Sequence, residues 1–205
     1  MIKPYSRLSI ALLAFICGCT TVPTPKYYRI PLDTPPASDA SLRPCRESLR
    51  IARFHAVAPL RQDSVVTYQE GSPLVSFSPS ECWESSPPDM VTRKLTQAFW
   101  AVRLFSRVDS RPSTPPATYL IRGKILRFNR LQTAHGLYGE VELQVEFVDM
   151  RNREILWSAR IQARKKARDR GREAAILAVG AALQQCIGQV VQRVEQASAY
   201  RRPSF

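Results

Sequence analysis

The sequence predicts an α+β domain in which an antiparallel sheet packs against two main helices. Residues 140–148 alternate apolar and polar side chains, and residues 154–163 repeat the pattern. Strict alternation of this kind is typical of half-buried strands. Residues 86–105 and 173–197 instead place apolar side chains three and four positions apart, which is typical of amphipathic helices.

The chain begins with a short charged segment followed by an apolar one. Lys3 and Arg7 precede nine mostly apolar residues, 8–16. A helix needs about 20 apolar residues to span a bilayer, so this stretch is too short and instead predicts the h-region of an export signal. The segment ends at Ile16-Cys17-Gly18-Cys19.

The segment that ends at Cys19 resembles a bacterial lipobox. Gly18 supplies the small side chain needed beside the cleavage site, whereas the competing Cys17 follows the bulky Ile16. We therefore expect lipidation of Cys19 with acyl chains such as palmitate, which anchor a protein firmly. The alternative is a plain secretory signal with an incidental cysteine. Because Thr20 stands where inner-membrane retention favours Asp, the resemblance implies the periplasmic leaflet of a Gram-negative outer membrane.

Removal of the signal peptide, residues 1–18, leaves 187 residues, the usual size of one domain. Five prolines between positions 23 and 36 make the next stretch a poor helix former. We expect residues 19–44 to hold the lipid anchor, a proline-rich tether and the first strand. Residues 45–199 should form the α+β domain, and residues 200–205 a C-terminal tail.

The strongly basic composition predicts attraction to polyanions. The formal net charge is +13, and loss of Lys3 and Arg7 leaves +11. Behind an export signal the available polyanions are anionic lipid headgroups, lipopolysaccharide phosphates and acidic proteins. No nucleic-acid partner is expected.

Four short strands are expected before the first helix. Tyr27-Tyr28-Arg29-Ile30 follows Pro25 and suits an edge strand, and residues 49–57 alternate weakly. Residues 65–69 and 74–77 flank a turn at Glu70-Gly71-Ser72-Pro73, so they predict a hairpin.

A helix-start signal lies at Ser86, Pro87 and Asp89, which supply a capping hydroxyl, a proline at the first position and an acid in the first turn. The apolar stripe that follows predicts a helix closed by Leu104 and Phe105. The stripe comprises Val91, Leu95, Ala98, Phe99, Val102 and Phe105. Proline-rich residues 111–116 then predict a loop.

Three further strands are expected over residues 119–128, 140–148 and 154–163. The apolar face of the last strand comprises Ile155, Trp157, Ala159 and Ile161. Folding the last two strands about residues 150–152 places an acidic ladder beside a basic one. Opposite charges in such cross-strand pairs contribute about 0.2 to 1 kcal/mol each.

A long helix is expected over residues 173–197. Its apolar stripe comprises Ile176, Val179, Leu183, Ile187, Val190 and Val194. No charged residue lies between Glu173 and Arg193, so a membrane span is the alternative. Four glutamines in this stretch argue against it, and we expect the helix to pack across a sheet face.

Three cysteines, Cys45, Cys82 and Cys186, remain besides Cys19. The periplasm permits a disulfide, for which Cys45 with Cys82 is the first guess. Cys186 lies on the apolar helix and is expected to be a small buried residue.

The sequence contains no recognisable catalytic or metal-binding motif. His55 and His135 have no cysteine or acid at metal-ligand spacing, and no nucleophile elbow or phosphate loop is present. Glu140, Glu142 and Glu146 share one strand face and are expected to be solvated rather than tuned for acid catalysis. We therefore expect no enzyme activity, no metal and no cofactor.

The densest charge cluster lies between the last strand and the last helix. It comprises Arg160, Arg164, Lys165, Lys166, Arg168, Arg170 and Arg172. One interpretation is a solvated strand end and loop. The other is a polyanion or partner patch, because each basic residue near an anionic membrane contributes about 1 kcal/mol. The lack of aromatic residues argues against single-stranded nucleic acid.

Several motifs follow the lipobox in a fixed order. They are Tyr27-Tyr28-Arg29-Ile30, Leu60-Arg61-Gln62-Asp63-Ser64-Val65-Val66, Trp83-Glu84, Pro87-Pro88-Asp89-Met90-Val91 and Leu104-Phe105. This order resembles the ABC-type transport auxiliary lipoprotein family, which includes the paraquat-inducible lipoprotein partner of MCE-type lipid transporters.

The resemblance implies a non-enzymatic component, anchored under the outer membrane, that assists an MCE-domain protein and an ABC permease complex. Such an assembly moves lipids across the envelope and supports membrane integrity. The resemblance also implies homo-oligomerisation and structural roles for Tyr27, Tyr28 and Trp83. The basic stretch from Arg160 to Arg172 and the three extra cysteines depart from the family pattern.

Two other functional classes stay open. One is a pilot or assembly lipoprotein of another outer-membrane complex, and the other is a free-standing periplasmic module that binds lipids or polyanions. The fold alone does not choose among them, whereas the copurifying proteins and lipids would.

Overall fold

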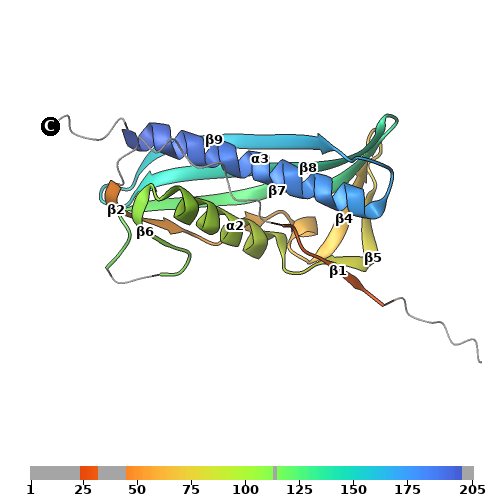
Figure 1. The fold of residues 1–205 in the computed structure, drawn as a ribbon, viewed down its shortest axis with the longest axis horizontal. Coiled ribbons are helices and arrows are strands. Elements are labelled where there is room, and N and C mark those ends of the chain that lie inside the picture. The colour runs from red at the N-terminus through yellow and green to blue at the C-terminus, as the bar shows by residue number, and fades with distance from the viewer. Residues whose placement is uncertain (1–23, 32–44, 113–114, 200–205) are drawn as a thin grey trace, which may run out of the picture.

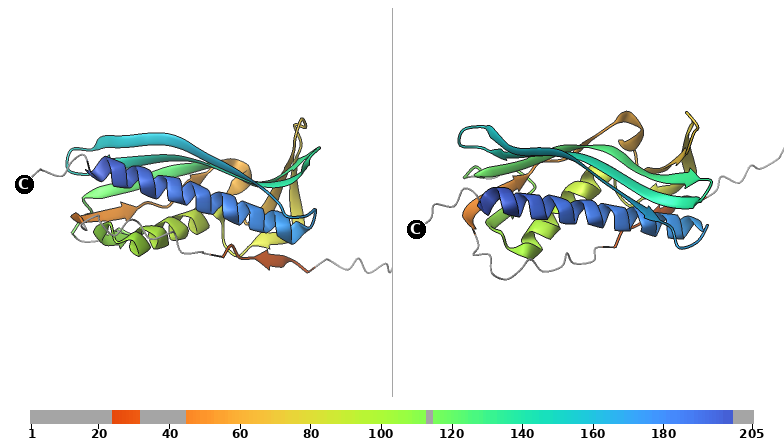
Figure 2. Two further views of the ribbon diagram at one scale, coloured as in Figure 1. Left: turned by 45° about the horizontal axis from the view of Figure 1, so that its top comes forward. Right: turned by 90° about the horizontal axis from the view of Figure 1, so that it is seen from above.

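A computed structural model describes residues 24–31, 45–112 and 115–199. The described chain confirms the α+β class: a nine-stranded sheet carries two helices on one face (Figures 1 and 2). The strands are β1 (Lys26–Tyr28), β2 (Cys45–Ile51), β3 (His55–Ala56), β4 (Ser64–Gln69), β5 (Val75–Trp83), β6 (Phe105–Asp109), β7 (Tyr119–Thr133), β8 (Gly136–Asp149) and β9 (Glu154–Lys166). The helices are α2 (Pro87–Val102) and α3 (Arg172–Ala199), with a short 3₁₀ turn η1 (Ala58–Leu60).

The long strand β7 organises the sheet. Along one edge it pairs in parallel with β2 at residues 119–121, with β3 at 124–125 and with β4 at 130–132. Along the other edge it pairs antiparallel with β8, which pairs antiparallel with β9. The predicted antiparallel sheet is therefore mixed, because three short segments share one edge of a strand that runs in their own direction.

The outer part of the sheet contains the predicted hairpin of β4 and β5, which is antiparallel. β1 pairs in parallel with β5, and β5 is its one pairing partner in the described chain. This confirms the predicted edge strand. The predicted strand over residues 49–57 is divided, since β2 ends at Ile51 and β3 begins at His55. Between them, the Phe54 amide donates to the Thr92 hydroxyl at 3.0 Å.

The predicted hairpin of the last two strands is confirmed and is longer than expected. Its register pairs Glu140 with Arg164, but the pairing shifts by one residue between Phe147 and Val148. A one-residue shift turns a side chain to the other face of a sheet. The assignment of Ile155 to the apolar face is therefore wrong, and its side chain is 49% exposed.

The first helix starts as predicted and ends earlier. Ser86 caps it, its hydroxyl accepting a hydrogen bond from the Asp89 amide at 3.4 Å. Arg103 takes a left-handed conformation with φ of 52°, which stops the helix. The expectation that Phe105 closes the helix is wrong, because Phe105 begins β6. Its ring packs among those of Phe99, Tyr119 and Phe147, with centroids 6.1, 5.9 and 6.5 Å away.

The predicted last helix is confirmed as α3, and its whole apolar stripe is buried. By length and composition α3 could cross a membrane, but 67% of its apolar stretch is buried inside the molecule. Cys186 is fully buried, with its sulfur 3.7 Å from the carbonyl oxygen of Val141. As predicted, α3 lies across a sheet face.

A glycine allows the close approach of α3 to β8. A Cβ atom on Gly139 would lie 2.0 Å from the backbone nitrogen of Val179. No side chain fits at such a separation. Gly139 therefore sets how closely the first half of α3 packs on the sheet.

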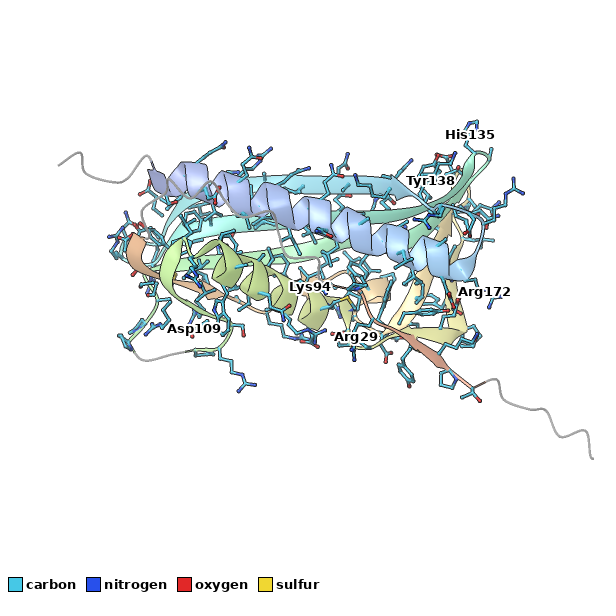
Figure 3. All side chains as sticks on the ribbon, in the orientation of Figure 1. Arg29, Lys94, Asp109, His135, Tyr138 and Arg172 are labelled. Atoms are coloured by element: carbon cyan, nitrogen blue, oxygen red, sulfur yellow. The ribbon has the colours of Figure 1, made fainter. Side chains whose placement is uncertain are left out.

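The elongated domain has two distinct ends. We call the first the basic end; it comprises the turns at residues 70–74 and 134–135 and the segment 165–172. The far end comprises residues 103–105 and the β8–β9 connection, 149–154. Figure 3 shows His135 and Arg172 at the basic end and Asp109 near the far end.

Candidate functional site

The structure divides the predicted basic cluster into two groups. Arg160 and Arg164 lie on β9 beside the acidic face of β8. Arg164 contacts Glu140 at 3.0 Å, and Arg160 lies 3.9 Å from Glu142. These two arginines therefore belong to the sheet.

The other five members gather at the basic end. They are Lys165, Lys166, Arg168, Arg170 and Arg172, and all are exposed. Within the described ranges, no carboxylate lies within 4.0 Å of their charged groups. Residues 164–173 contain six basic and two acidic residues. The basic end therefore carries uncompensated positive charge.

The loop that carries these cations is held by backbone contacts. The amide of Ala167 donates to the Leu137 carbonyl at 2.8 Å, and Ala167 is buried against Ala175 and Ala178. The Asp169 carboxylate accepts a hydrogen bond from the Gly171 amide at 2.5 Å. These contacts fix the loop between β9 and α3, so the cations project from a defined backbone.

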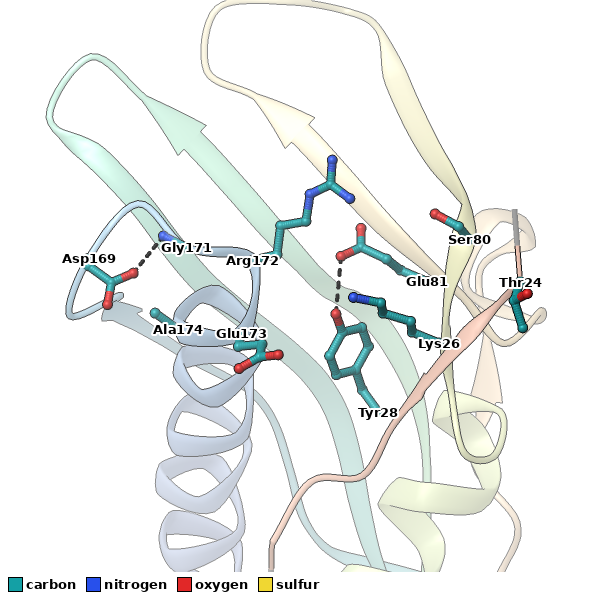
Figure 4. Close-up of a pocket in the computed structure, with 10 residues that line it drawn as sticks. All are labelled: Thr24, Lys26, Tyr28, Ser80, Glu81, Asp169, Gly171, Arg172, Glu173 and Ala174. Carbon is teal, nitrogen blue, oxygen red and sulfur yellow. Dashed lines mark hydrogen bonds between the residues drawn. The ribbon is translucent and has the colours of Figure 1, made fainter. Parts of the chain in front are cut away.

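A pocket of about 520 Å³ opens beside this loop (Figure 4). Its lining comprises Thr24, Lys26, Tyr28, Ser80, Glu81, Asp169, Gly171, Arg172, Glu173 and Ala174. In Figure 4 the side chains of Lys26, Tyr28 and Arg172 gather around Glu81. The pocket therefore lies between the first strand, β1, and the start of the last helix, α3.

Glu81, which lines this pocket, forms a buried ion pair with Arg130. Arg130 donates to both carboxylate oxygens of Glu81, at 2.8 and 3.3 Å, and to the Thr67 hydroxyl at 3.1 Å. The side chains of Arg130 and Glu81 are 11% and 3% exposed. Tyr28 donates a weaker hydrogen bond to Glu81 at 3.4 Å. The network thus ties β1, β4, β5 and β7 together.

The electrostatics of the pair keep Glu81 ionised. Burial alone would raise the pKa of Glu81, but hydrogen bonds from Arg130 and Ser78 outweigh it and lower that pKa. Burial and the neighbouring carboxylate raise the pKa of Tyr28. Glu81 is therefore a fixed anion that positions cations, rather than a proton donor near neutral pH.

The expected solvation of the acidic ladder is wrong for Glu140, which is buried. Arg127 donates to both of its oxygens at 3.1 Å, and Arg164 adds a third bond. Burial would raise the pKa of Glu140, yet the hydrogen bonds from Arg164 and Arg127 lower it. Glu140 is thus a structural anion between two basic strands.

Cys82 and Cys186, whose side chains the structure describes, show no features of nucleophiles. Burial raises the pKa of the Cys82 thiol, and it raises that of Cys186 to about 12, whereas reactive cysteines have lowered values. In the described part of the chain, no three His, Cys, Asp or Glu side chains are grouped to hold a metal ion.

The first guess of a bridge between Cys45 and Cys82 is wrong. Cys82 carries a free thiol. Cys45 lies in β2 and Cys82 in β5, which pairs with β4. β2 and β4 line the same edge of β7 at residues 119–121 and 130–132, so the two cysteines are separated along β7 by about ten residues, or roughly 30 Å, whereas a disulfide needs Cα atoms within about 7 Å.

The aromatic motif residues lie on neighbouring strands. Tyr28 is opposite Trp83, and Tyr27 is opposite Cys82, in the parallel pair of β1 and β5. Trp83 is buried and makes an edge contact with Phe128, with centroids 5.2 Å apart. Tyr27 is exposed. Cys19 lies outside the described residues.

Sequence reasoning missed the Glu81–Arg130 pair and the role of residues 24–31. This segment is packed into the domain: Lys94 donates to the Ile30 carbonyl at 2.5 Å, and Ile30 is buried. The sequence contained one signal of this packing, the apolar Ile30 at the end of the predicted strand. The partners of Glu81 gave none, because Arg130 lies 49 positions away.

Comparisons with known proteins agree with this fold. The model of one protein family, described as the ABC-type transport auxiliary lipoprotein component, matches residues 28–191. Among curated proteins, none matches the sequence.

The solved structures that resemble the chain include three proteins with TM-scores of 0.52 or higher. Protein XCC0632 from Xanthomonas campestris has a TM-score of 0.74 at 13% identity, covering 85% of this chain and 98% of its own. An uncharacterized protein has a TM-score of 0.66 at 12% identity, covering 83% and 99%. The hypothetical protein CT253 from Chlamydia trachomatis has a TM-score of 0.52 at 10% identity, covering 75% and 98%. At these identities the likeness extends to the fold.

Proposed function

We propose that this chain, which belongs to the ABC-type transport auxiliary lipoprotein family, serves an MCE-type system that moves lipids across the envelope. The family match over residues 28–191 carries the proposal, since it spans nearly all of the described domain. In this proposal the protein acts without catalysis, as an auxiliary component that binds other parts of the transporter.

The proposed location is the periplasmic leaflet of the outer membrane. It is supported by the lipobox-like segment that ends at Cys19 and by Thr20 after it. Lipidation at Cys19 would add several acyl chains, each of which contributes about 0.8 kcal/mol per buried methylene. Mass spectrometry of the N-terminal peptide tests this part directly: an unmodified Cys19 would contradict it.

We also propose that copies of the chain associate. In the described chain β9 pairs with β8 alone, so its other edge presents unpaired backbone groups, which are suited to strand pairing. Size-exclusion chromatography with light scattering in mild detergent measures the assembly. A monomer at every concentration would contradict this part.

Affinity purification from envelopes in mild detergent tests the main proposal. Mass spectrometry of the recovered proteins should find an MCE-domain protein and an ABC permease. Recovery of a secretin or another outer-membrane β-barrel alone would instead indicate a pilot lipoprotein, and recovery of lipid without protein would indicate a free-standing carrier. Either result would contradict the transporter proposal.

A further inference from the structure

The basic end lies next to the point where the described chain begins. Thr24 lines the same pocket as Arg172 and Asp169. The segment that follows Thr24 is held in place, because the Glu84 amide donates to the Tyr28 carbonyl at 2.9 Å and Lys94 binds the Ile30 carbonyl. The direction in which the chain leaves the domain is thus fixed at this end.

Chain length limits how far the basic end can lie from the anchor. Cys19 precedes Thr24 by five residues. At about 3.4 Å per residue, a fully extended chain covers about 17 Å. If Cys19 carries the lipid, as the proposed function requires, the basic end must lie within about two Debye lengths of the membrane surface.

The charge at this end suits a negatively charged surface. Five exposed cations have no ion-pair partner in the described residues, as shown above. Lys26 adds a sixth exposed cation beside the pocket. Because none of these groups must break a salt bridge first, their charge is available to an anionic partner.

Exposed apolar side chains lie on the neighbouring strands and in the turn that joins two of them. Tyr27 and Leu74 are 65% and 72% exposed, and Phe77 is also exposed. Leu74 and Phe77 belong to the β4–β5 hairpin, whose turn lies at the basic end. Basic residues combined with exposed aromatic and aliphatic ones are typical of surfaces that lie in the headgroup region of a membrane.

We propose that the basic end is a contact surface for anionic lipid headgroups. It holds the domain with this end against the membrane that the lipid anchor enters, and it leaves the far end directed toward the periplasm. This inference rests on the proposed lipidation of Cys19, because the short connection to the anchor is what brings the surface to the membrane.

Vesicle flotation tests the surface separately from the anchor. The protein is the mature chain from residue 19 with Cys19→Ser, which retains every described residue and lacks the lipid. It is mixed with vesicles of phosphatidylcholine alone or with phosphatidylglycerol. We expect binding to the vesicles that contain phosphatidylglycerol, weak binding to the others, and loss of binding as salt is added.

Two charge variants of this chain provide the decisive comparison. The first replaces Lys165, Lys166, Arg168 and Arg170 by Gln. The second replaces Arg103, Arg111, Lys124 and Arg153 by Gln, which removes the same charge away from the basic end. We expect the first variant to bind at least about tenfold more weakly than the second, with both folded by circular dichroism.

Equal binding to both vesicle types, or equal loss in the two variants, would overturn the proposal. Binding of the chain to an acidic protein, without any binding to vesicles, would also overturn it and would indicate a protein partner. None of these results bears on the transporter proposal, because that proposal is tested by copurification of the lipidated chain. Conversely, a failed copurification would not alter vesicle binding.

Discussion

Arg151 at the far end of the domain and the arginines of the basic end differ in what they contact. At the far end, Arg151 donates to Asp149 at 2.6 Å and to Glu47 at 3.0 Å. Its guanidinium also lies over the ring of Tyr119, 5.5 Å from the centroid. Hydrogen bonds to Asp149 raise the pKa of Arg151. At the basic end, Arg168 and Arg170 are exposed and have no ion pair in the described chain.

This difference shows that charge composition alone does not locate a binding surface. Acidic and basic residues are mixed around Arg151, from Asp149 to Glu154, and Arg151 itself is paired within the fold. The loop after β9 contains basic residues with few acids nearby. An arginine that forms ion pairs within the fold is structural, whereas an arginine without such a pair is available to a ligand. The number of arginines does not make this distinction.

The largest effect is expected at the buried Glu81–Arg130 pair beside the basic end. Arg130→Met should destabilise the domain by about 3 to 5 kcal/mol, because it leaves the buried Glu81 carboxylate without its main partner. Adding Glu81→Gln should recover part of the loss. Urea unfolding measures both variants. A loss below about 1 kcal/mol would mean that water replaces Arg130 and that the pair does not hold the end together.

A slightly smaller effect is expected from Gly139→Ala. The added methyl would meet the backbone of α3, so we expect a loss of about 2 to 3 kcal/mol. Gly188→Ala is the matched control on the open side of α3, where a Cβ meets nothing within 4 Å. It should stabilise the helix by about 1 kcal/mol. Thermal unfolding of both variants checks the opposite signs.

At the far end, Arg151→Gln should cost about 1 to 2 kcal/mol. The guanidinium is half exposed, which limits its contribution, but Asp149 is buried and would lose the bonds from that guanidinium, while the bond from the backbone amide of residue 151 at 2.9 Å remains. The loss should thus be smaller than that of Arg130→Met. Equal losses in urea unfolding would remove the distinction between the two ends.

The pH dependence should reveal Glu81. Its folded pKa lies below the ordinary value of 4.5, so its contribution is present above that pH and is lost as the pH falls through the folded pKa. The stability difference between the wild type and the Glu81→Gln, Arg130→Met double variant should therefore shrink as the pH falls below 4.5. A stability difference that stays constant down to the pH of acid denaturation would show that the ionised Glu81 is not its source.

The smallest effect on stability is expected from the four Gln substitutions at Lys165, Lys166, Arg168 and Arg170. These side chains make no ion pair within the described residues, so the unfolding free energy should change by less than about 0.5 kcal/mol. A clear loss would show that the cations stabilise the fold, and it would place them in the same class as Arg151.

Local periodicity explains which elements the sequence predicts. The β8–β9 hairpin and α3 follow from the regular spacing of apolar residues over about ten residues or more. Most of the residues in that spacing are the ones that the fold buries. The end of α2 does not follow, because it depends on the left-handed conformation of one residue, Arg103. The apolar stripe continues through Phe105 by spacing alone, although that residue begins β6.

Long-range pairing explains what the sequence could not predict. The parallel pairing of β2, β3 and β4 with β7 depends on contacts between distant segments, and so does the register that places Cys45 and Cys82 at different levels along β7. The basic cluster was visible as a run of residues. Its division into paired Arg164 and unpaired Arg168 required the register of β8 and β9.

In the proposed orientation the two ends of the domain face opposite ways, with the basic end at the membrane. Photo-crosslinking of the full-length lipidated protein in vesicles that contain a phosphatidylglycerol with a photoreactive headgroup tests it most directly. Mass spectrometry should find the crosslinks in peptides that contain residues 165–172 and 74–77. Crosslinks concentrated in residues 149–154, or spread equally over both ends, would contradict the account.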